Sequence, residues 1–220
     1  MDERSSLGTA SKRGCVSRNA HVEATSNLSR AAQVAAALRH VHGAGLAHRD
    51  VKPDNVLLDG PRAVLVDLGS CARIPDVVGD RRGALALADE AAEHSTAPYR
   101  APELWAPQPG DAVDGKCDVW ALGCVAWALC YGYGPSEAEP RDDGSFAFVD
   151  AGHSRSLSAP KGAPQAPQRR HAPAFAAALE DLARALLAPD PAARPDAAAA
   201  AALVDGLAAS LDGRAADERV

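Results

Sequence analysis

Four polar residues between positions 50 and 67 have the types and spacing that phosphoryl transfer needs. Asp50, Lys52 and Asn55 fall in one short stretch, and Asp67 follows further along the chain. A carboxylate can orient or deprotonate an attacking hydroxyl, and a lysine can contact the moving phosphate. Magnesium accepts carboxylate and amide oxygens beside phosphate and water. We therefore predict Asp50 and Lys52 as catalytic residues, and Asn55 and Asp67 as magnesium ligands.

The elements that must position these residues are mostly helices. Apolar runs at 55–58 and 63–66, separated by Asp59-Gly60-Pro61-Arg62, predict a small β-hairpin beside the polar stretch. Apolar residues on one face predict a helix that begins at its caps Ser26-Asn27 and ends at Gly43. A run over 116–131, apolar on nearly all sides, predicts a buried central helix. Further helices are expected over 84–93, from about 175 to 186, and after Asp196.

Three segments differ from this helical body. Residues 1–25 are polar and lack a helical or strand period, which predicts a disordered leader. Residues 135–172 are rich in Pro, Gly and Ser, which predicts a long exposed excursion that is partly disordered. Residues 212–220 are predicted to form a polar tail. One mainly α domain over 26–211 remains.

Composition and charge exclude several kinds of protein. The net charge is −6 and no lysine/arginine block is long, so nucleic acid is not an expected partner. The five cysteines form an odd set without a Cys-x-x-Cys pair, which argues against disulfides and a zinc site. Cys124 and Cys130 are predicted to pack on the central helix. No apolar run approaches membrane-spanning length and no secretory signal follows Met1, so we predict a cytoplasmic protein.

The order of the motifs resembles that of the eukaryotic protein kinase superfamily. His48-Arg49-Asp50-Val51-Lys52-Pro53-Asp54-Asn55 is similar to the catalytic loop, and Asp67-Leu68-Gly69 is similar to the metal-binding Asp-Phe-Gly motif. Residues 96–103 resemble the substrate-binding loop with its Ala-Pro-Glu end, and residues 118–123 resemble the start of the central helix. The resemblance covers about residues 26–211 and implies a kinase C-terminal lobe with a small β-hairpin.

The same resemblance implies a serine/threonine protein kinase that uses ATP and Mg²⁺ and acts on protein substrates. Lys52, two residues after Asp50, is the serine/threonine pattern. By analogy, Thr96 bonds Asp50 and Lys52, and Asp118 braces the backbone at His48. The remaining roles are Leu57 in the surface under adenine, Tyr99 in the substrate loop, and structural positions for His48, Arg49, Glu103, Asp118 and Arg194, the last paired with Glu103.

Within the superfamily, residues 67–70, 84–87 and 95–103 are most similar to the Numb-associated kinases, in particular the myristoylated and palmitoylated member. That acylated relative needs glycine at the second position, whereas this chain has Asp2, so a lipid anchor is not carried over. Membrane association is expected by family analogy alone. Nothing before Leu28 resembles a glycine-rich loop or a strand lysine, so the N-terminal lobe is predicted to be largely absent. As it stands, the 220-residue chain is then expected to bind ATP weakly and to have little activity.

Two other functions stay open. A pseudokinase-like binding module would fit the missing N-terminal lobe, but intact Asp50, Asn55 and Asp67 oppose it. A small-molecule phosphotransferase could share the catalytic loop, but the peptide platform at 96–103 opposes it. His40 and His42 are predicted to be surface residues or helix caps. Ser70, Ser95 and Thr96 are weak phosphosite candidates for which Arg49 would be a natural phosphate partner.

Overall fold

The computed structural model describes residues 10–131, 139–140, 146–147 and 173–217, with side chains over 26–126, 178–179 and 181–210. The helices are α1 (Ala10–Gly43), α2 (Arg81–His94), α3 (Pro102–Trp105), α4 (Lys116–Tyr131), α5 (Pro173–Leu186) and α6 (Ala197–Asp217). The strands are β1 (Leu46–Ala47), β2 (Val56–Asp59), β3 (Arg62–Leu65), β4 (Ala72–Arg73), β5 (Asp76–Val77), β6 (Ala112–Val113), β7 (Glu139–Pro140) and β8 (Phe146–Ala147). Short 3-10 turns lie at Pro53–Asn55, Leu68–Ser70, Ala97–Tyr99 and Pro191–Ala193.

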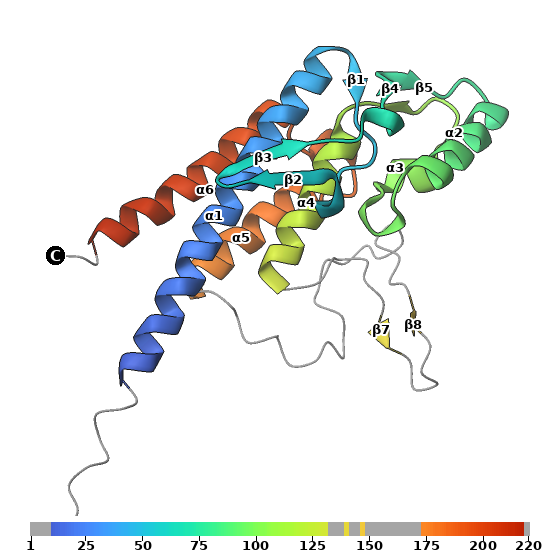
Figure 1. Cartoon of the computed structure of the whole chain (residues 1–220). Helices are drawn as coiled ribbons and strands as arrows, with labels where there is room; N and C mark the ends of the chain where they lie inside the picture. The colour runs from blue at the N-terminus through green and yellow to red at the C-terminus, as the bar shows by residue number, and fades with distance from the viewer. Residues whose placement is uncertain (1–9, 132–138, 141–145, 148–172, 218–220) are drawn as a thin grey trace, which may run out of the picture.

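The strands of the described residues form four antiparallel pairs, β1–β4, β2–β3, β5–β6 and β7–β8. Around strands β1 to β6, the helices α1, α4, α5 and α6 lie on one side and α2 and α3 on the other (Figure 1). The prediction of a mainly α protein is confirmed for the described part. No larger sheet of the kind found in a kinase N-terminal lobe occurs there, and the absence of that lobe stays a prediction.

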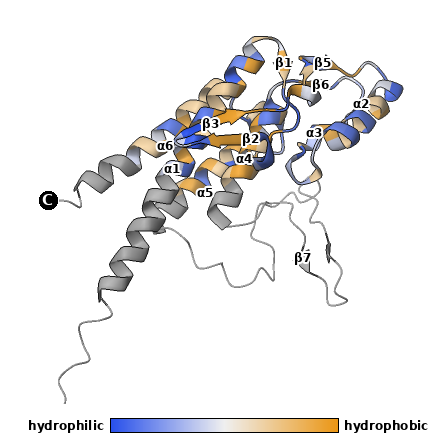
Figure 2. Cartoon of the chain, in the orientation of Figure 1, coloured by the Kyte–Doolittle hydropathy of each residue, from blue (hydrophilic) through white to orange (hydrophobic). Residues whose placement is uncertain are grey.

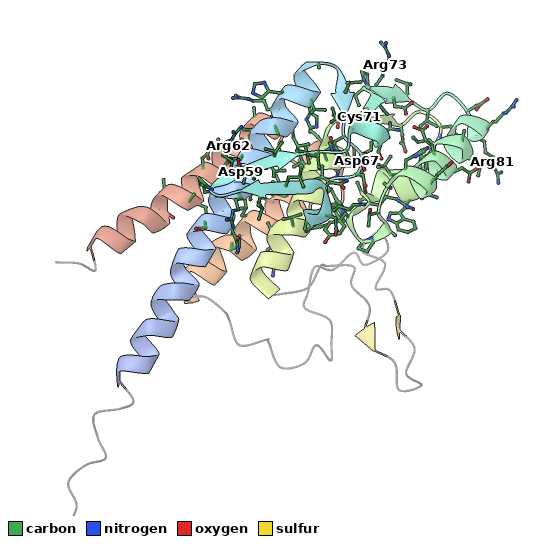
Figure 3. All side chains as sticks on the ribbon, viewed as in Figure 1. Asp59, Arg62, Asp67, Cys71, Arg73 and Arg81 are labelled. Atoms are coloured by element: carbon green, nitrogen blue, oxygen red, sulfur yellow. The ribbon has the colours of Figure 1, made fainter. Side chains whose placement is uncertain are left out.

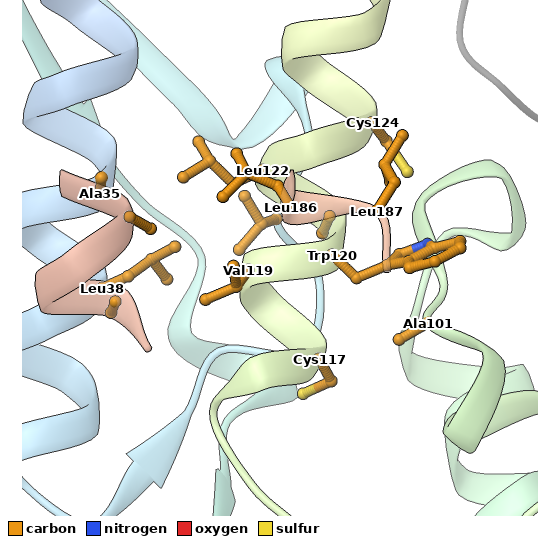
Figure 4. Close-up of a cluster of buried hydrophobic side chains, with 14 of the residues drawn as sticks. Ala35, Leu38, Ala101, Cys117, Val119, Trp120, Leu122, Cys124, Leu186 and Leu187 are labelled. Atoms are coloured by element: carbon orange, nitrogen blue, oxygen red, sulfur yellow. The ribbon is translucent and has the colours of Figure 1, made fainter. Parts of the chain in front are cut away.

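Helix α4 lies at the centre of the core. Val119, Trp120, Leu122 and Cys124 on this helix are buried, which agrees with its nearly uniform apolar sequence. They meet Leu186 and Leu187 around the end of α5 on one side, and Ala35 and Leu38 of α1 on another (Figure 4). Burial raises the pKa of the Cys117 and Cys124 thiols, so these cysteines stay protonated and act as packing residues.

Helix α1 agrees with its predicted core face but not with its predicted start. Leu28, Ala32, Ala35 and Leu38 are buried as expected. The helix begins at Ala10, however, and therefore runs through most of the segment expected to be disordered. A helix that packing has already nucleated can extend by one hydrogen bond per residue without a new nucleation cost, so this extension needs no apolar pattern of its own. Residues 1–9 lie outside the described part.

The other predicted elements lie close to their expected places. The hairpin pairs Val56 with Leu65 and Asp59 with Arg62, which shifts both strands by one residue from the predicted runs. Asp196 caps α6 by accepting a hydrogen bond from the backbone N–H of Ala199 at 2.8 Å. Most of the predicted excursion at 135–172 lies outside the described residues, apart from β7 and β8. None of the described helices is long and apolar enough to cross a membrane.

Two glycines in helices should respond oppositely to alanine. A Cβ at Gly123 of α4 would lie 2.8 Å from Leu186 Cβ and 2.9 Å from Leu187 Cγ, whereas one at Gly206 of α6 would meet nothing within 4 Å. We expect Gly206→Ala to stabilise the protein by up to about 1 kcal/mol through helix propensity. Gly123→Ala should destabilise it, because overpacking of about 1–3 kcal/mol exceeds the same gain. Urea denaturation of both variants tests this, and equal signs would show that α4 and α5 pack less closely than described.

Candidate active site

The carboxylate of Asp118, in the first turn of α4, holds the backbone of the predicted catalytic loop. Its Oδ2 accepts the N–H of His48 at 2.7 Å and its Oδ1 accepts the N–H of Arg49 at 2.7 Å. Arg49 has φ +64°, a left-handed conformation that L-residues disfavour. The contact expected between Asp118 and the backbone at His48 is therefore present, and it fixes an unfavourable turn of the chain.

His42, at the end of α1, contacts the candidate site in a way that the sequence did not predict. Its Nε2 lies 2.8 Å from Asp118 Oδ2, although it was predicted to be a surface residue or cap. Gly115 makes room for the ring, since a Cβ there would lie 2.5 Å from two ring atoms. No local sequence pattern predicts this contact, because 76 positions separate the two residues. His42 thus contacts the same carboxylate that holds the backbone of the predicted catalytic loop.

Asp50 is at the centre of a network of four residues. Its Oδ1 accepts hydrogen bonds from the backbone N–H of Thr96 at 2.9 Å and from the Thr96 hydroxyl at 2.7 Å. Its Oδ2 accepts from Lys52 Nζ at 2.8 Å and from Asn55 Nδ2 at 3.0 Å. Lys52 Nζ also donates to the Thr96 hydroxyl at 2.6 Å. The structure therefore brings together both predicted catalytic residues, one predicted metal ligand and one substrate-loop residue.

The protonation of Asp50 follows from two opposing effects. Burial by itself raises the pKa of this carboxyl, because desolvation disfavours the charged form. Hydrogen bonds from Lys52 and Thr96 outweigh burial, and the pKa lies below its ordinary value. Asp50 is therefore a carboxylate at neutral pH, and both of its oxygens act as hydrogen-bond acceptors.

The two predicted magnesium ligands lie at adjoining ends of the hairpin. Val66 donates its N–H to the carbonyl of Asn55 at 2.9 Å, which places Asp67 one residue beyond the partner of Asn55. Asn55 Nδ2 also donates to the Asp50 carbonyl at 2.8 Å. Because a carbonyl only accepts, the side-chain nitrogen of Asn55 must face Asp50. The side-chain oxygen Oδ1 then takes part in neither of the two hydrogen bonds to Asp50. That oxygen is the atom a metal would use.

Asp67 itself is exposed and turned by a left-handed φ of +65°. Its Oδ1 accepts the N–H of Gly69 at 3.3 Å, and it forms no ion pair with a described residue. Figure 3 shows it on the side of the hairpin away from Asp59 and Arg62 at the turn. A carboxylate without a cation and an oriented amide oxygen form a donor set that fits Mg²⁺.

The hairpin also carries an apolar face beside these ligands. Leu57 and Val64 stand opposite one another in the register and are 59% and 42% exposed. Figure 2 shows both strands in the hydrophobic colours. The position of Leu57 agrees with a surface that an aromatic base could cover, as the kinase resemblance implies. Tyr99, predicted for the substrate loop, is half-buried in the turn that follows Thr96.

Comparison with known proteins agrees with this geometry. Residues 8–203 match the protein kinase domain family. The chain belongs to this family. Serine/threonine-protein kinase 16 of Mus musculus is 38% identical over 159 residues, which cover 72% of this chain and 48% of that protein. Human SBK2 is 36% identical over 174 residues, covering 73% and 43% of the two chains, and ppk13 of Schizosaccharomyces pombe is 36% identical over 104 residues, covering 46% and 30%.

All three relatives carry the name serine/threonine-protein kinase. The chain spans about half the length of the first of them. The residues that match the family, 8–203, include the loop at 48–55 and Thr96 and Asp118, which contact it. The network at Asp50 therefore lies within the kinase domain.

Arg194 joins Glu103, at the end of the predicted substrate loop, to the helical core. It pairs with Glu103 through both nitrogens, Nη1 to Oε1 at 2.7 Å and Nη2 to Oε2 at 2.6 Å. It also donates to the carbonyls of Ala188, Lys116 and Pro189, and its guanidinium lies 5.2 Å from the ring of Trp120. The pair expected between Glu103 and Arg194 is therefore present, with the arginine side chain fully buried.

Removal of this arginine should destabilise the domain strongly. Arg194→Ala leaves the Glu103 carboxylate, only 11% exposed, without its partner. We expect a loss of about 3–5 kcal/mol in the free energy of unfolding, because an uncompensated buried charge remains. Denaturant unfolding followed by circular dichroism measures it. Arg82→Ala, at an exposed position of α2, is the matched control and should change stability by less than about 0.5 kcal/mol; similar values for both variants would contradict the role of the pair.

Proposed function

We propose that this chain is the catalytic part of a serine/threonine protein kinase, which transfers the γ-phosphate of ATP to a protein hydroxyl. The observation that carries the proposal is the carboxylate of Asp50, bonded at once by Lys52, Asn55 and Thr96. Phosphoryl transfer depends mainly on positioning and on neutralising charge, and this network supplies both. ATP and Mg²⁺ are the cofactors that the family implies.

The network also indicates how a substrate hydroxyl reaches Asp50. A carboxylate offers about four acceptor positions, and Thr96, Lys52 and Asn55 fill them with four hydrogen bonds. One donor must therefore leave before a hydroxyl can bond. Lys52 is the donor able to do so, because its flexible side chain is 21% exposed and its ammonium is attracted to a phosphate.

The low pKa of Asp50 favours a hydroxyl-orienting role over proton storage. An efficient general base has a pKa near the working pH, whereas burial opposed by bonds from Lys52 and Thr96 leaves the pKa of Asp50 below its ordinary value. Asp50 aligns the nucleophile and accepts its proton only as the bond to phosphorus forms. When Mg²⁺ is bound, it neutralises charge on the phosphates, and Asn55 and Asp67 are the residues placed to hold it.

Finer features of the proposal rest on the sequence. Residues 67–70, 84–87 and 95–103 support kinship with the Numb-associated kinases. A cytoplasmic location is supported by the odd cysteine set without Cys-x-x-Cys pairs. The platform at 96–103, joined to Asp50 through Thr96, favours a protein substrate over a small molecule.

Substitution of Asp50 tests the function directly. Asp50→Asn should reduce Mg²⁺-dependent phosphate transfer to a serine or threonine peptide by about 10²- to 10⁴-fold, because the amide cannot accept a proton and pairs poorly with Lys52. The assay measures radioactive phosphate incorporation with this chain and with a longer form that carries an N-terminal lobe.

Asp54→Asn is the matched control in the same loop. Asp54 is exposed and has no predicted role, so its variant should retain the wild-type rate. Equal rates for the Asp50→Asn and wild-type proteins would refute the assignment. Transfer that is absent from the wild-type longer form would refute the proposed function itself.

A further inference from the structure

A single side-chain amide of α1 holds the turn end of the β2–β3 hairpin. Gln33 Nε2 donates a hydrogen bond to the Pro61 carbonyl at 2.9 Å, and Gln33 Oε1 accepts the backbone N–H of Ala63 at 2.9 Å. Because a carbonyl only accepts and an N–H only donates, the amide has one possible orientation. Arg30, one turn earlier on α1, donates from its Nη2 to the Gly60 carbonyl at 3.2 Å. We name these three hydrogen bonds the hairpin tether.

The tether occupies the outer edge of strand β3. Hydrogen-bonded and non-hydrogen-bonded pairs alternate along an antiparallel ladder. Val66 donates to the Asn55 carbonyl across the hairpin, so Ala63 and Leu58, three pairs further along, form a non-hydrogen-bonded pair. The N–H of Ala63 therefore points away from β2. Since β2 and β3 form a two-stranded sheet, Gln33 supplies the acceptor that a third strand would otherwise provide.

The hairpin has little apolar packing of its own. Three of the four residues of β2 are exposed, and its contacts with the core come from the partly buried Val56, Ala63 and Leu65. A two-stranded hairpin without further support is only marginally stable in water. Helix α1, in contrast, is fixed because Ala35 and Leu38 are completely buried. Polar bonds from α1 therefore hold the hairpin turn at a fixed place on the core.

The opposite end of the hairpin carries the candidate metal ligands. Asn55 directly precedes β2, and Asp67 lies two residues after the end of β3. His48 Nε2 lies 3.1 Å from the Val66 carbonyl oxygen, which fixes this end against the catalytic loop. Leu57, between the two attachments, is 59% exposed. The hairpin is thus held at both ends, and its exposed face lies between them.

We propose that Gln33 is a positioning residue for nucleotide and metal binding, which acts by fixing the hairpin through both hydrogen bonds of its amide. Arg30 assists it with one longer bond to the turn. This inference rests on the proposed kinase function, since that function assigns the exposed face of the hairpin to ATP and its open end to Mg²⁺. The effect of the tether on the hairpin itself can be measured without activity.

The peptide side of the site should depend far less on the tether. Thr96, in the predicted substrate loop, bonds Asp50, and Lys52 bonds both of them. Both partners of Asp50 in these contacts lie outside the hairpin. A loosened hairpin should therefore weaken the binding of Mg-ATP, while the binding of the peptide stays near that of the wild type.

Hydrogen–deuterium exchange of the purified chain tests the tether. Gln33→Met keeps the length of the side chain and removes both bonds, so the amides of residues 56–59 and 62–65 should exchange at least about fivefold faster than in the wild type. Arg30→Met removes one bond and should show a smaller increase at the same amides. Exchange in α4 should stay unchanged in every variant, because the tether does not contact that helix.

Arg39→Met is the matched control on α1. Arg39 is exposed, so the same replacement there should leave exchange of the hairpin unchanged. The tether is refuted if the hairpin exchanges alike in Gln33→Met and Arg39→Met. Faster exchange of α4 together with the hairpin would indicate global loss of stability and would equally refute a local tether. An unchanged hairpin in Arg30→Met would remove Arg30 from it.

Kinetics tests the link to the nucleotide. In whichever form of the protein shows Asp50-dependent transfer, Gln33→Met should raise the KM for Mg-ATP by about two- to tenfold, because the binding-competent hairpin is less populated. The KM for the peptide should stay near its wild-type value. A merely destabilised enzyme would instead lose active molecules, which lowers the apparent kcat and leaves both KM values unchanged.

The two proposals can fail separately. Equal changes in both KM values, or no change in either, would overturn the positioning role of Gln33 while leaving the kinase function in place. Absence of Asp50-dependent transfer would overturn the proposed function, and the exchange experiment would still decide whether α1 holds the hairpin.

Discussion

The carboxylate of Asp118 is the constraint on which the geometry of the site depends. It is 1% exposed; its oxygens accept hydrogen bonds from two backbone N–H groups, and its Oδ2 lies 2.8 Å from His42 Nε2. The left-handed conformation of Arg49 costs about 1–2 kcal/mol. Hydrogen bonds to a charged group contribute about 1.5–3 kcal/mol each, so the two bonds from the loop more than offset this strain. Since α4 is fixed by the core around Trp120, the core sets the path of the catalytic loop.

This arrangement divides the site into a rigid half and an open half. Asp50, Asn55 and His48 are buried and bonded within the protein, so their positions are set before any ligand arrives. Asp67 and the apolar side chains of Leu57 and Leu68 are exposed. Exposed apolar side chains beside an unpaired carboxylate are typical of a surface that binds another molecule. In the proposed function, the nucleophile would be aligned by the buried half, whereas nucleotide and metal would bind at the exposed half.

The sequence predicted the elements whose signals are local. The central helix has the predicted bounds 116–131, since an unbroken apolar run and terminal glycines mark it, and the hairpin is displaced by one residue. The contacts expected of Thr96, Asp118 and Arg194 came from the family resemblance, and their roles in catalysis stay predictions. The start of α1 at Ala10 could not be predicted from the sequence, because a helix that extends from a packed part needs no periodic apolar pattern. The contact of His42 with Asp118 and those of Asp76 and Glu90 with Arg49 were missed because the partners lie far apart in the sequence.

Arg49 combines a left-handed backbone conformation with a side chain that forms ion pairs to Asp76 and Glu90. Glycine would adopt φ +64° more readily, and the turn by itself gives no reason for a long side chain there. Glycine, however, could not reach Asp76 and Glu90, and the segment between Asp67 and Thr96 would lose its two ion pairs with the loop. An arginine at this position therefore carries backbone strain that Asp118 compensates, and in return its guanidinium joins the segment to the loop. The backbone strain at Arg49 and its ion pairs with the segment thus belong to the same residue. The buried carboxylate of Asp118 stabilises the backbone conformation from which the side chain reaches both acids.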